Sequence, residues 1–415
     1  MTAVAVPAAP GWQSLSAVDR CWRGIEFTRV ITAIDLPRIE DVRRAMWQLA
    51  CATPEVRRWY RPGTAQWRPV LDGERDEWLA ATVVKADAAD GVPAAMAAQP
   101  RLAGIPLRIS VGPDWVGARQ DHGLGDGWSN LQLLSHLLRQ ARRLAPIALP
   151  WARTSPRRRD LGLVRGVVRH PHTAVRAVRA RHELRGGRYE PASRHADGLG
   201  PSTVHRVSAA GFTEHVRALR DAHVPGASVA ALTLVGLRQA LRATLPPARP
   251  GFECVFDTRY TMARAFGNWS AGVYLVPIDD LSPVAVTDAI VRARRTGLPI
   301  LASASMRARR PDMARQVVAP EGAPRLTLSF SHLRRGDVQL PGLDEQRGQL
   351  AIDTVPNGVE SISASIFDFG GRLHLNVSFY AQVWPLEAVE RAVTDFVADP
   401  ARCLQTPPAR TGAPA

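Results

Sequence analysis

Apolar residues recur along the first part of this chain at the spacings typical of helices and strands. Between residues 38 and 52 they stand three or four positions apart, at Val42, Ala45, Met46 and Leu49, which predicts a helix. Shorter apolar and β-branched runs predict strands at 29–34, 107–111 and 115–119. Further helices are predicted after Ser16 and after Ser129, and the segment 72–84 is ambiguous.

The second part of the chain repeats this mixture. Helices are predicted at 212–222, 228–244 and 284–295, and strands at 202–207, 254–257, 272–278, 325–331 and within 362–380. Asp-Phe-Gly-Gly at 368–371 predicts a hairpin turn inside the last of these segments. Helices and strands follow a similar order in both parts, which predicts an α/β protein of two related units.

The length of 415 residues exceeds one usual hydrophobic core and predicts two domains. We expect a flexible tail at 1–13, a first lobe at 14–150, an Arg-rich linker at 151–200, a second lobe at 201–405 and a flexible tail at 406–415. The linker is distinctive because residues 151–190 contain eleven arginines and only three acidic residues. With 46% hydrophobic and 22% charged residues, the whole chain is too apolar for wholesale disorder.

The formal net charge is +15, and almost all of the positive charge is arginine, because Lys85 is the only lysine. Such a charge attracts nucleic acid, acidic lipid, phosphate-bearing molecules or an acidic protein. No motif combines aromatic and basic residues in the way of a nucleic-acid binder, so we expect no nucleic-acid partner. The four cysteines have no metal-binding spacing, and no segment resembles a signal peptide or membrane span. We therefore expect a cytoplasmic protein without a bound metal.

One segment, His122-Gly123-Leu124-Gly125-Asp126-Gly127, lies between a predicted strand and a predicted helix. Histidine is the side chain best suited to take a proton near neutral pH, and a helix start offers free N–H groups to a developing negative charge. Asp126 is too close in sequence for an independent acid and is expected to pair with an arginine that shapes the loop. The three glycines are expected to allow unusual backbone angles. The alternative is an ordinary glycine-rich turn that contains one histidine.

The chain resembles the chloramphenicol acetyltransferase superfamily, which includes condensation domains, wax ester synthases and polyketide-associated acyltransferases. His122 to Gly127 matches its HxxxDG motif, 257–259 matches its Asp-x-Arg strand, and Gly267-Asn268 matches the following Gly-Asn. In order, the resemblance covers residues 14 to 395. It implies two similar lobes that form a pseudo-dimer with a tunnel at their junction, and it implies that Arg259 pairs with Asp126.

The resemblance also implies an acyltransferase. His122 would deprotonate a hydroxyl or amine of a lipid or secondary metabolite, which attacks an acyl thioester of CoA or of a carrier protein's phosphopantetheine, with no bound cofactor. Gly127 and Ser331 are the oxyanion candidates. The candidates for the tunnel wall are Trp128, Gly267, Asn268 and Trp269. The alternatives are a free-standing condensation-type domain that forms an amide or ester, and a catalytically degenerate scaffold.

Asp121 is a departure from condensation domains, which usually carry a second histidine at that position. It is expected either to raise the basicity of His122 or to be solvated. Candidate partners are a small-molecule acceptor, an acidic carrier protein attracted to the Arg-rich linker, and an anionic membrane surface in peripheral contact with residues 157–188. We expect a monomer.

Overall fold

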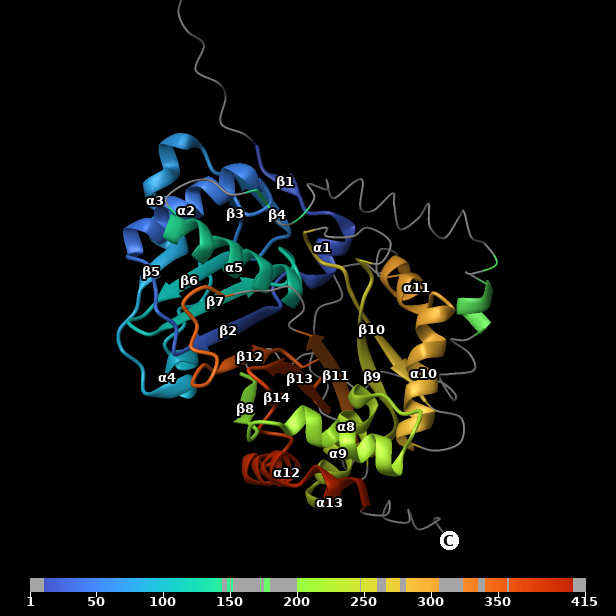
Figure 1. The fold of residues 1–415 in the computed structure, drawn as a ribbon. Helices are drawn as coiled ribbons and strands as arrows, with labels where there is room; N and C mark the ends of the chain where they lie inside the picture. The colour runs from blue at the N-terminus through green and yellow to red at the C-terminus, as the bar shows by residue number, and fades with distance from the viewer. Residues whose placement is uncertain are drawn as a thin grey trace, which may run out of the picture.

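The computed structural model describes residues 11–143, 148–149, 151, 172, 175–179, 200–246, 248–259, 266–276, 281–305, 324–334, 340–356 and 358–405. These residues form two lobes, each with a β-sheet and helices packed against it (Figure 1). The N-terminal lobe is blue to teal in Figure 1, and the C-terminal lobe is green to red. The predicted α/β fold of two lobes is confirmed.

The sheet of the N-terminal lobe consists of the strands β12 (Leu350–Thr354), β2 (Glu26–Thr32), β7 (Trp115–Asp121), β6 (Leu107–Val111) and β5 (Val83–Lys85), in this spatial order. A separate small sheet consists of β1 (Gln13–Ser14), β4 (Gln66–Pro69) and β3 (Arg58–Tyr60). The helices are α1 (Ala17–Trp22), α2 (Ile39–Ala52), α3 (Arg75–Thr82), α4 (Gly91–Ala97) and α5 (Gly127–Arg143), with a 3-10 turn at Asp72–Glu74.

Both faces of this five-stranded sheet are covered. Successive residues of a strand point to opposite faces, and on β2 Phe27 and Ile31 belong to the core formed with α2 and α5. Val30 packs on the other face with Ala95 of α4. Arg29 shares the face of Phe27 and Ile31, so the strand buries a charged side chain beneath α5.

The sheet of the C-terminal lobe consists of β10 (Ser270–Leu275), β9 (Ala248–Asp257), β11 (Leu326–Arg334), β13 (Ser361–Phe369), β14 (Arg372–Phe379) and β8 (Ser202–Val207), in this order. Its helices are α8 (Phe212–His223), α9 (Val229–Thr244), α10 (Pro283–Arg295), α11 (Leu298–Ser305), α12 (Leu386–Ala398) and α13 (Pro400–Gln405). β11 is parallel to both of its neighbours, β9 and β13, and the other pairs are antiparallel.

The two faces of this second sheet differ in polarity. On β13, Ile362, Ala364 and Ile366 point into the core that α8, α9 and α12 cover. The alternate residues of the same strand, Ser363 and Ser365, line a cavity instead. Because successive residues of a strand point to opposite faces, the sheet has an apolar face under the helices and a hydroxyl-rich face toward the other lobe.

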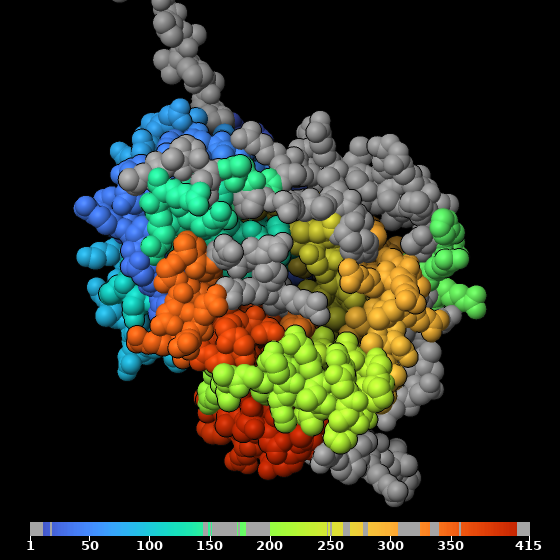
Figure 2. Space-filling model, in the orientation of Figure 1, coloured from blue at the N-terminus to red at the C-terminus, as the bar shows by residue number. Residues whose placement is uncertain are grey.

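β12 links the two lobes. It comes from the second part of the chain, yet it pairs with β2 at the edge of the N-terminal sheet, with Ile352 opposite Arg29. The segment before it, orange in Figure 2, lies against the blue and teal lobe. There Asp344 N–H donates to the Ala33 carbonyl at 3.0 Å. The sequence placed all of 201–405 in one lobe, and this strand departs from that division because its hydrogen-bonding partner lies in the other lobe.

Most of the predicted elements are present. The four helices expected at 38–52, 212–222, 228–244 and 284–295 begin and end within one residue of those bounds. The hairpin at 368–371 turns at Gly370 and Gly371, whose φ angles of 59° and 67° are those of a two-residue type I′ turn. The ambiguous segment 72–84 contains the 3-10 turn, α3 and the start of β5. β12, α4, α11, α12 and α13 were not predicted.

The Arg-rich linker predicted at 151–200 lies almost entirely outside the described residues, as do most of the two tails. Among the helices that the structure describes, none has both the length and the apolar character needed to cross a bilayer.

Candidate active site

His122 lies in the turn between β7 and α5, where the two lobes meet. Its backbone N–H donates to the carbonyl of Ile25 at 2.7 Å, which ties the turn to the chain just before β2. The imidazole is stacked on the indole of Trp22, with ring centres 4.3 Å apart and planes 17° apart. Phe27 meets the ring edge-on, with centres 5.4 Å apart. The ring is thus held between two aromatic side chains while one side remains open to the cavity.

The two nitrogens of this imidazole have different surroundings. Nδ1 lies 3.0 Å from Nδ2 of Asn268, and the same amide donates to the His122 carbonyl at 3.2 Å. Nε2 has no hydrogen-bond partner in the described part of the chain, so it is available to a molecule in the cavity. Burial lowers the pKa of His122 below 6.5, although the charge of Asp126 and the residue's own carbonyl oppose this shift. The ring is neutral at pH 7, as a general base must be.

Asp126 and Arg259 form an ion pair across 133 positions of sequence. Nη2 of Arg259 lies 2.7 and 2.8 Å from the two carboxylate oxygens, and the side chains are 2% and 7% exposed. Burial would raise the pKa of Asp126, but the charge and hydrogen bonds of Arg259, with backbone N–H donors, outweigh it and lower that pKa. The pairing that the resemblance implied is present, and Asp126 supports the site without facing the substrate cavity.

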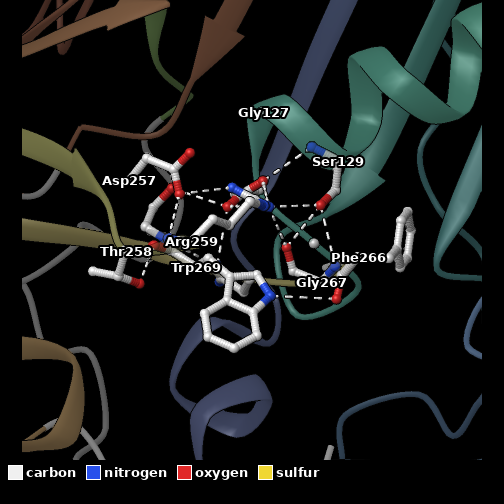
Figure 3. Close-up of polar contacts among 12 residues, drawn as sticks. Gly127, Ser129, Asp257, Thr258, Arg259, Phe266, Gly267 and Trp269 are labelled. Atoms are coloured by element: carbon white, nitrogen blue, oxygen red, sulfur yellow. Dashed lines mark hydrogen bonds and ion pairs between the residues drawn. The ribbon is translucent and has the colours of Figure 1, made fainter. Parts of the chain in front are cut away.

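This ion pair organises the segment that follows Arg259 (Figure 3). The Trp269 N–H donates to Asp126 at 3.0 Å, and Nη2 of Arg259 donates to the Gly267 carbonyl at 3.0 Å. The Ser129 hydroxyl also donates to the Gly267 carbonyl, at 2.8 Å. These bonds place Asn268 against His122. The aspartate therefore positions the histidine indirectly, through a segment of the other lobe.

Asp121 is neither solvated nor in contact with the His122 ring, so both expectations for it are wrong. It is fully buried and paired with the guanidinium of Arg23, and it accepts from the N–H groups of Gly24 at 2.9 Å and Gly123 at 2.8 Å. Burial raises its pKa, and Arg23 opposes the shift. Asp121 fixes the beginning of the turn in the same way that Asp126 fixes its end.

Gly123 and Gly125 are required because a side chain would not fit, and not because the backbone adopts unusual angles. No glycine from 123 to 127 has a positive φ, so the expected conformational role is wrong for all three. A Cβ on Gly123 would lie 2.9 Å from Oδ1 of Asp121 and 3.0 Å from the Asp19 carbonyl. A Cβ on Gly125 would lie 3.0 Å from Cβ of Ser129. Close packing against buried anchors is what requires residues without side chains here.

A cavity of about 900 Å³ lies between the lobes at His122. Trp22, Phe27 and Ile352 line it from the N-terminal lobe, and serines of β11 and β13 line it from the C-terminal lobe. Of the expected wall residues only Trp128 contributes to this lining. Gly267, Asn268 and Trp269 lie behind His122, where they hold the ring and the ion pair.

The two oxyanion candidates both line this cavity. Gly127 is the first residue of α5, and its N–H has no acceptor among the described residues. The Asn130 N–H donates to the Asp126 carbonyl at 3.0 Å. The Gly127 N–H belongs to the same peptide group as that carbonyl and points the opposite way, out of the start of the helix. The Ser331 hydroxyl likewise has no partner in the described part of the chain.

Sequence reasoning missed a buried polar chain behind the turn. Arg29 donates to Oδ1 of Asn130 at 2.7 Å and to the Gly127 carbonyl at 3.0 Å. Nδ2 of Asn130 donates to Gln120, whose amide donates to the Gly125 carbonyl at 2.7 Å. Burial lowers the pKa of Arg29 to about 9, and Asp126 opposes the shift. The only sequence signal was a charged residue at an inward position of β2.

Trp22 was missed as well, because nothing in a short helix marks a tryptophan as the neighbour of a histidine 100 positions later. Among the described residues, no three His, Cys, Asp or Glu side chains are grouped as a metal site.

No family model and no curated protein sequence matches this chain. Solved structures do match it. The condensation domain of the Monacolin K polyketide synthase MokA is 12% identical, with 96% of this chain and 98% of that chain covered and a TM-score of 0.63. TRI3 trichothecene 15-O-acetyltransferase from Fusarium sporotrichioides is 12% identical, with 94% and 97% covered and a TM-score of 0.55.

The nonribosomal peptide synthetase FmoA3 matches 96% of this chain at 16% identity with a TM-score of 0.61. This chain spans only 43% of the length of FmoA3. In each case the match covers at least 94% of this chain and therefore both lobes, and at these low identities it shows a similar fold only. The chain has the two-lobed fold of condensation domains and chloramphenicol acetyltransferase-like enzymes.

Proposed function

We propose that this protein is an acyltransferase that moves an acyl group from a thioester to a hydroxyl or amine acceptor. The observation that carries the proposal is the neutral imidazole of His122, held between Trp22 and Phe27 and open at Nε2 to a cavity between two lobes. The fold supports it, because solved relatives with this fold include condensation domains and an acetyltransferase. The donor is acyl-CoA or an acyl group on a carrier protein's phosphopantetheine.

In the proposed reaction Nδ1 of His122 carries the ring proton and directs it to the residue's own carbonyl, so that Nε2 has a free lone pair. Nε2 takes the proton of the acceptor as its oxygen or nitrogen bonds to the thioester carbon. The carbonyl oxygen becomes an oxyanion, and the N–H of Gly127 and the hydroxyl of Ser331 stabilise it. The C–S bond then breaks, and the proton on His122 passes to the sulfur. The products are the acylated acceptor and a free thiol.

The test is acceptor-dependent thiol release from a panel of acyl-CoA and acyl-carrier-protein donors, with alcohols and amines as acceptors. A positioned general base contributes about 100-fold or more, so we expect His122→Ala to lose at least that much. His223→Ala, on the exposed end of α8, is the matched control and should retain full activity. Thiol release by His122→Ala at the wild-type rate would show that the base is wrongly assigned.

The same assay separates the two remaining functions. An amine acceptor used in preference to every alcohol would favour a condensation-type domain that forms amides. Thiol release from none of the donors, by a protein that still binds them, would favour a scaffold. The intact ion pair of Asp126 and Arg259 supports an active enzyme, because a degenerate site has no need of a buried charge pair.

A further inference from the structure

Four serines form a grid on the floor of the cavity. Ser329 and Ser331 belong to β11, Ser363 and Ser365 belong to β13, and all four line the cavity. The strands are paired so that Ser329 lies opposite Ser363 and Ser331 lies opposite Ser365. Neighbouring strands are about 5 Å apart and alternate residues about 7 Å apart, so the hydroxyls form a rectangle of roughly that size. We call these four residues the serine grid.

The four hydroxyl groups of the serine grid have no hydrogen-bond partner in the part of the chain that the structure describes. This is unusual, since Ser329 is 4% and Ser365 7% exposed, and buried hydroxyls are normally paired. Ser329 and Ser363 belong to a row of residues that runs across the sheet to Ser378 on β14 and Thr203 on β8. The hydroxyls at that far end of the row, where β12 covers the sheet, do have hydrogen-bond partners. There Ser378 accepts from the Thr354 N–H at 3.2 Å and contacts the Thr203 hydroxyl at 2.9 Å. Where β12 covers the sheet, the hydroxyls of this row are therefore paired, whereas the four hydroxyls that line the cavity have no partner among the described residues.

Two more polar side chains continue the row of Ser329. Glu253 on β9 is paired with Ser329, and Tyr274 on β10 is paired with Glu253; both line the cavity. Gly272 makes room for the carboxylate, because a Cβ there would lie 2.2 Å from Oε1 of Glu253. A carboxylate accepts hydrogen bonds from hydroxyl groups, and serine hydroxyls both donate and accept them. The floor therefore suits a ligand with several hydroxyls.

An apolar acceptor would be disfavoured on this floor. It would displace water from the serine grid without replacing the lost hydrogen bonds, at a cost for every hydroxyl left unpaired. Sites that hydrogen-bond a substrate hydroxyl reject analogues without it far more strongly than apolar pockets reject an extra methylene. The structural observation thus selects among the acceptors that His122 could activate.

We propose that the acyl acceptor is a polyhydroxylated molecule: one hydroxyl reaches His122 while others bind the serine grid. This inference rests on the proposed acyltransferase function and names its substrate class. One acceptor O–H is deprotonated, its oxygen bonds to the acyl carbon, the C–S bond breaks, and the thiol leaves with the proton. The product is a mono-ester of a polyol.

The test compares glycerol, sorbitol and glucose with 1-hexanol and hexylamine as acceptors for acetyl-CoA and hexanoyl-CoA. We expect thiol release with at least one polyol to exceed that with 1-hexanol about tenfold in kcat/KM. The double variant Ser363→Ala/Ser365→Ala loses two hydrogen bonds and should raise the polyol KM about tenfold with kcat and the acyl-CoA KM little changed. Ser361→Ala is the matched control: its hydroxyl is on the same strand and face but is enclosed by protein outside the cavity lining.

Polyol binding measured without catalysis separates this inference from the proposed function. Saturation-transfer NMR with sorbitol should show binding to the wild type and to His122→Ala, and reduced binding to Ser363→Ala/Ser365→Ala. Such a pattern would support the serine grid even if no donor releases thiol. The inference is overturned if sorbitol, glycerol and glucose all fail to bind, or if 1-hexanol or hexylamine is the better acceptor. It is equally overturned if the double variant raises the acyl-CoA KM alone, or if Ser361→Ala has the same effect as the double variant.

Discussion

The indole of Trp22 lies parallel to the imidazole of His122, 4.3 Å away. The two residues come from different elements: the helix α1, and the turn after β7. Stacking holds the ring in one orientation, and it also favours the imidazolium that forms when His122 takes a proton. The tryptophan is therefore a positioning residue for the proposed base.

Because Trp22 is stacked on His122, the fluorescence of Trp22 can report the protonation of His122. The pKa of His122 is lowered below 6.5, so the base is neutral at pH 7 and becomes charged only as the pH falls through the lower, folded-state pKa. We expect kcat/KM for thiol release to fall with an acid midpoint below 6.5. Trp22 emission, taken as wild type minus Trp22→Phe, should be quenched with the same midpoint. A midpoint at or above 6.5 in either measurement would contradict the burial of the base.

Loss of the stack should lower activity without abolishing it. A cation–π contact in a partly buried site is worth about 1 kcal/mol, so Trp22→Ala should lower kcat/KM roughly five- to tenfold. Trp22→Phe keeps an aromatic face and should lose less. Equal activity of both variants and the wild type would show that the stack has no part in the reaction.

We expect a lysine at position 259 to stabilise the fold less than Arg259 does. A lysine keeps the charge but cannot reproduce the bonds from Nη2 to Asp126, Ser129 and the Gly267 carbonyl. Breaking a buried ion pair from one side costs about 3–5 kcal/mol, so we expect that loss in the free energy of unfolding for Arg259→Met, and a smaller loss for Arg259→Lys. Urea unfolding measures both.

The matched control for Arg259 is Arg206, whose side chain on β8 is 39% exposed and lies 3.6 Å from Glu390. Exposed ion pairs contribute about 0–1 kcal/mol, so Arg206→Met should change the free energy of unfolding little. A double variant of Arg259→Met with Asp126→Asn should be less unstable than the sum of the single changes. Strict additivity would show that the two side chains do not interact.

Arg29 offers a change that separates activity from stability. It is a fully buried cation that holds Asn130 and the Gly127 carbonyl, and in the described residues it has no ion-pair partner. Arg29→Met leaves the buried oxygens of Asn130 and Gly127 without a donor, which costs about 1–3 kcal/mol, but it also removes the cost of burying a lone charge. Because these two effects oppose each other, we expect the free energy of unfolding to change by no more than about 1 kcal/mol. We expect kcat/KM to fall about tenfold, since two hydrogen bonds to the start of α5 are lost. An unchanged kcat/KM in Arg29→Met would show that Arg29 does not position the start of α5 for the reaction.

We expect His374, at the junction of the lobes, to make the free energy of unfolding depend on pH in the acid range. Its Nδ1 accepts from the Leu350 N–H of β12 at 3.2 Å, which requires an unprotonated nitrogen. Burial, together with the charges of His205 and Arg372, lowers the pKa of His374 to about 3. The unfolded chain takes up this proton near pH 6.5 and the folded protein only near pH 3. Below pH 6.5 we therefore expect the free energy of unfolding to fall by roughly 1 kcal/mol per pH unit from this residue.

Asparagine places an acceptor oxygen where Nδ1 of His374 lies and cannot be protonated. His374→Asn should therefore flatten the acid dependence of the free energy of unfolding between pH 6.5 and 4. His223→Asn, at an exposed position of α8, is the control and should leave the dependence unchanged. If both variants behave like the wild type, His374 does not control the acid response.

The sequence by itself determined the features that depend on neighbouring positions. Apolar spacing predicted α2, α8, α9 and α10 almost to the residue, because the helical period is a local property. Two glycines predicted the hairpin turn, because positive φ angles are open to them. The HxxxDG motif pointed to His122, and the resemblance pointed to Arg259 as the partner of Asp126.

The tertiary structure alone decided which distant segments meet. β12 is a short strand whose own residues do not say that it pairs with β2, because strand pairing depends on a partner more than 300 positions away. The same is true of Trp22 over His122, of Asn268 at its Nδ1, and of the serine grid. Each serine is unremarkable in its own strand. In the part of the chain that the structure describes, the parallel register of β11 and β13 brings four serine hydroxyls without a hydrogen-bond partner to one cavity floor.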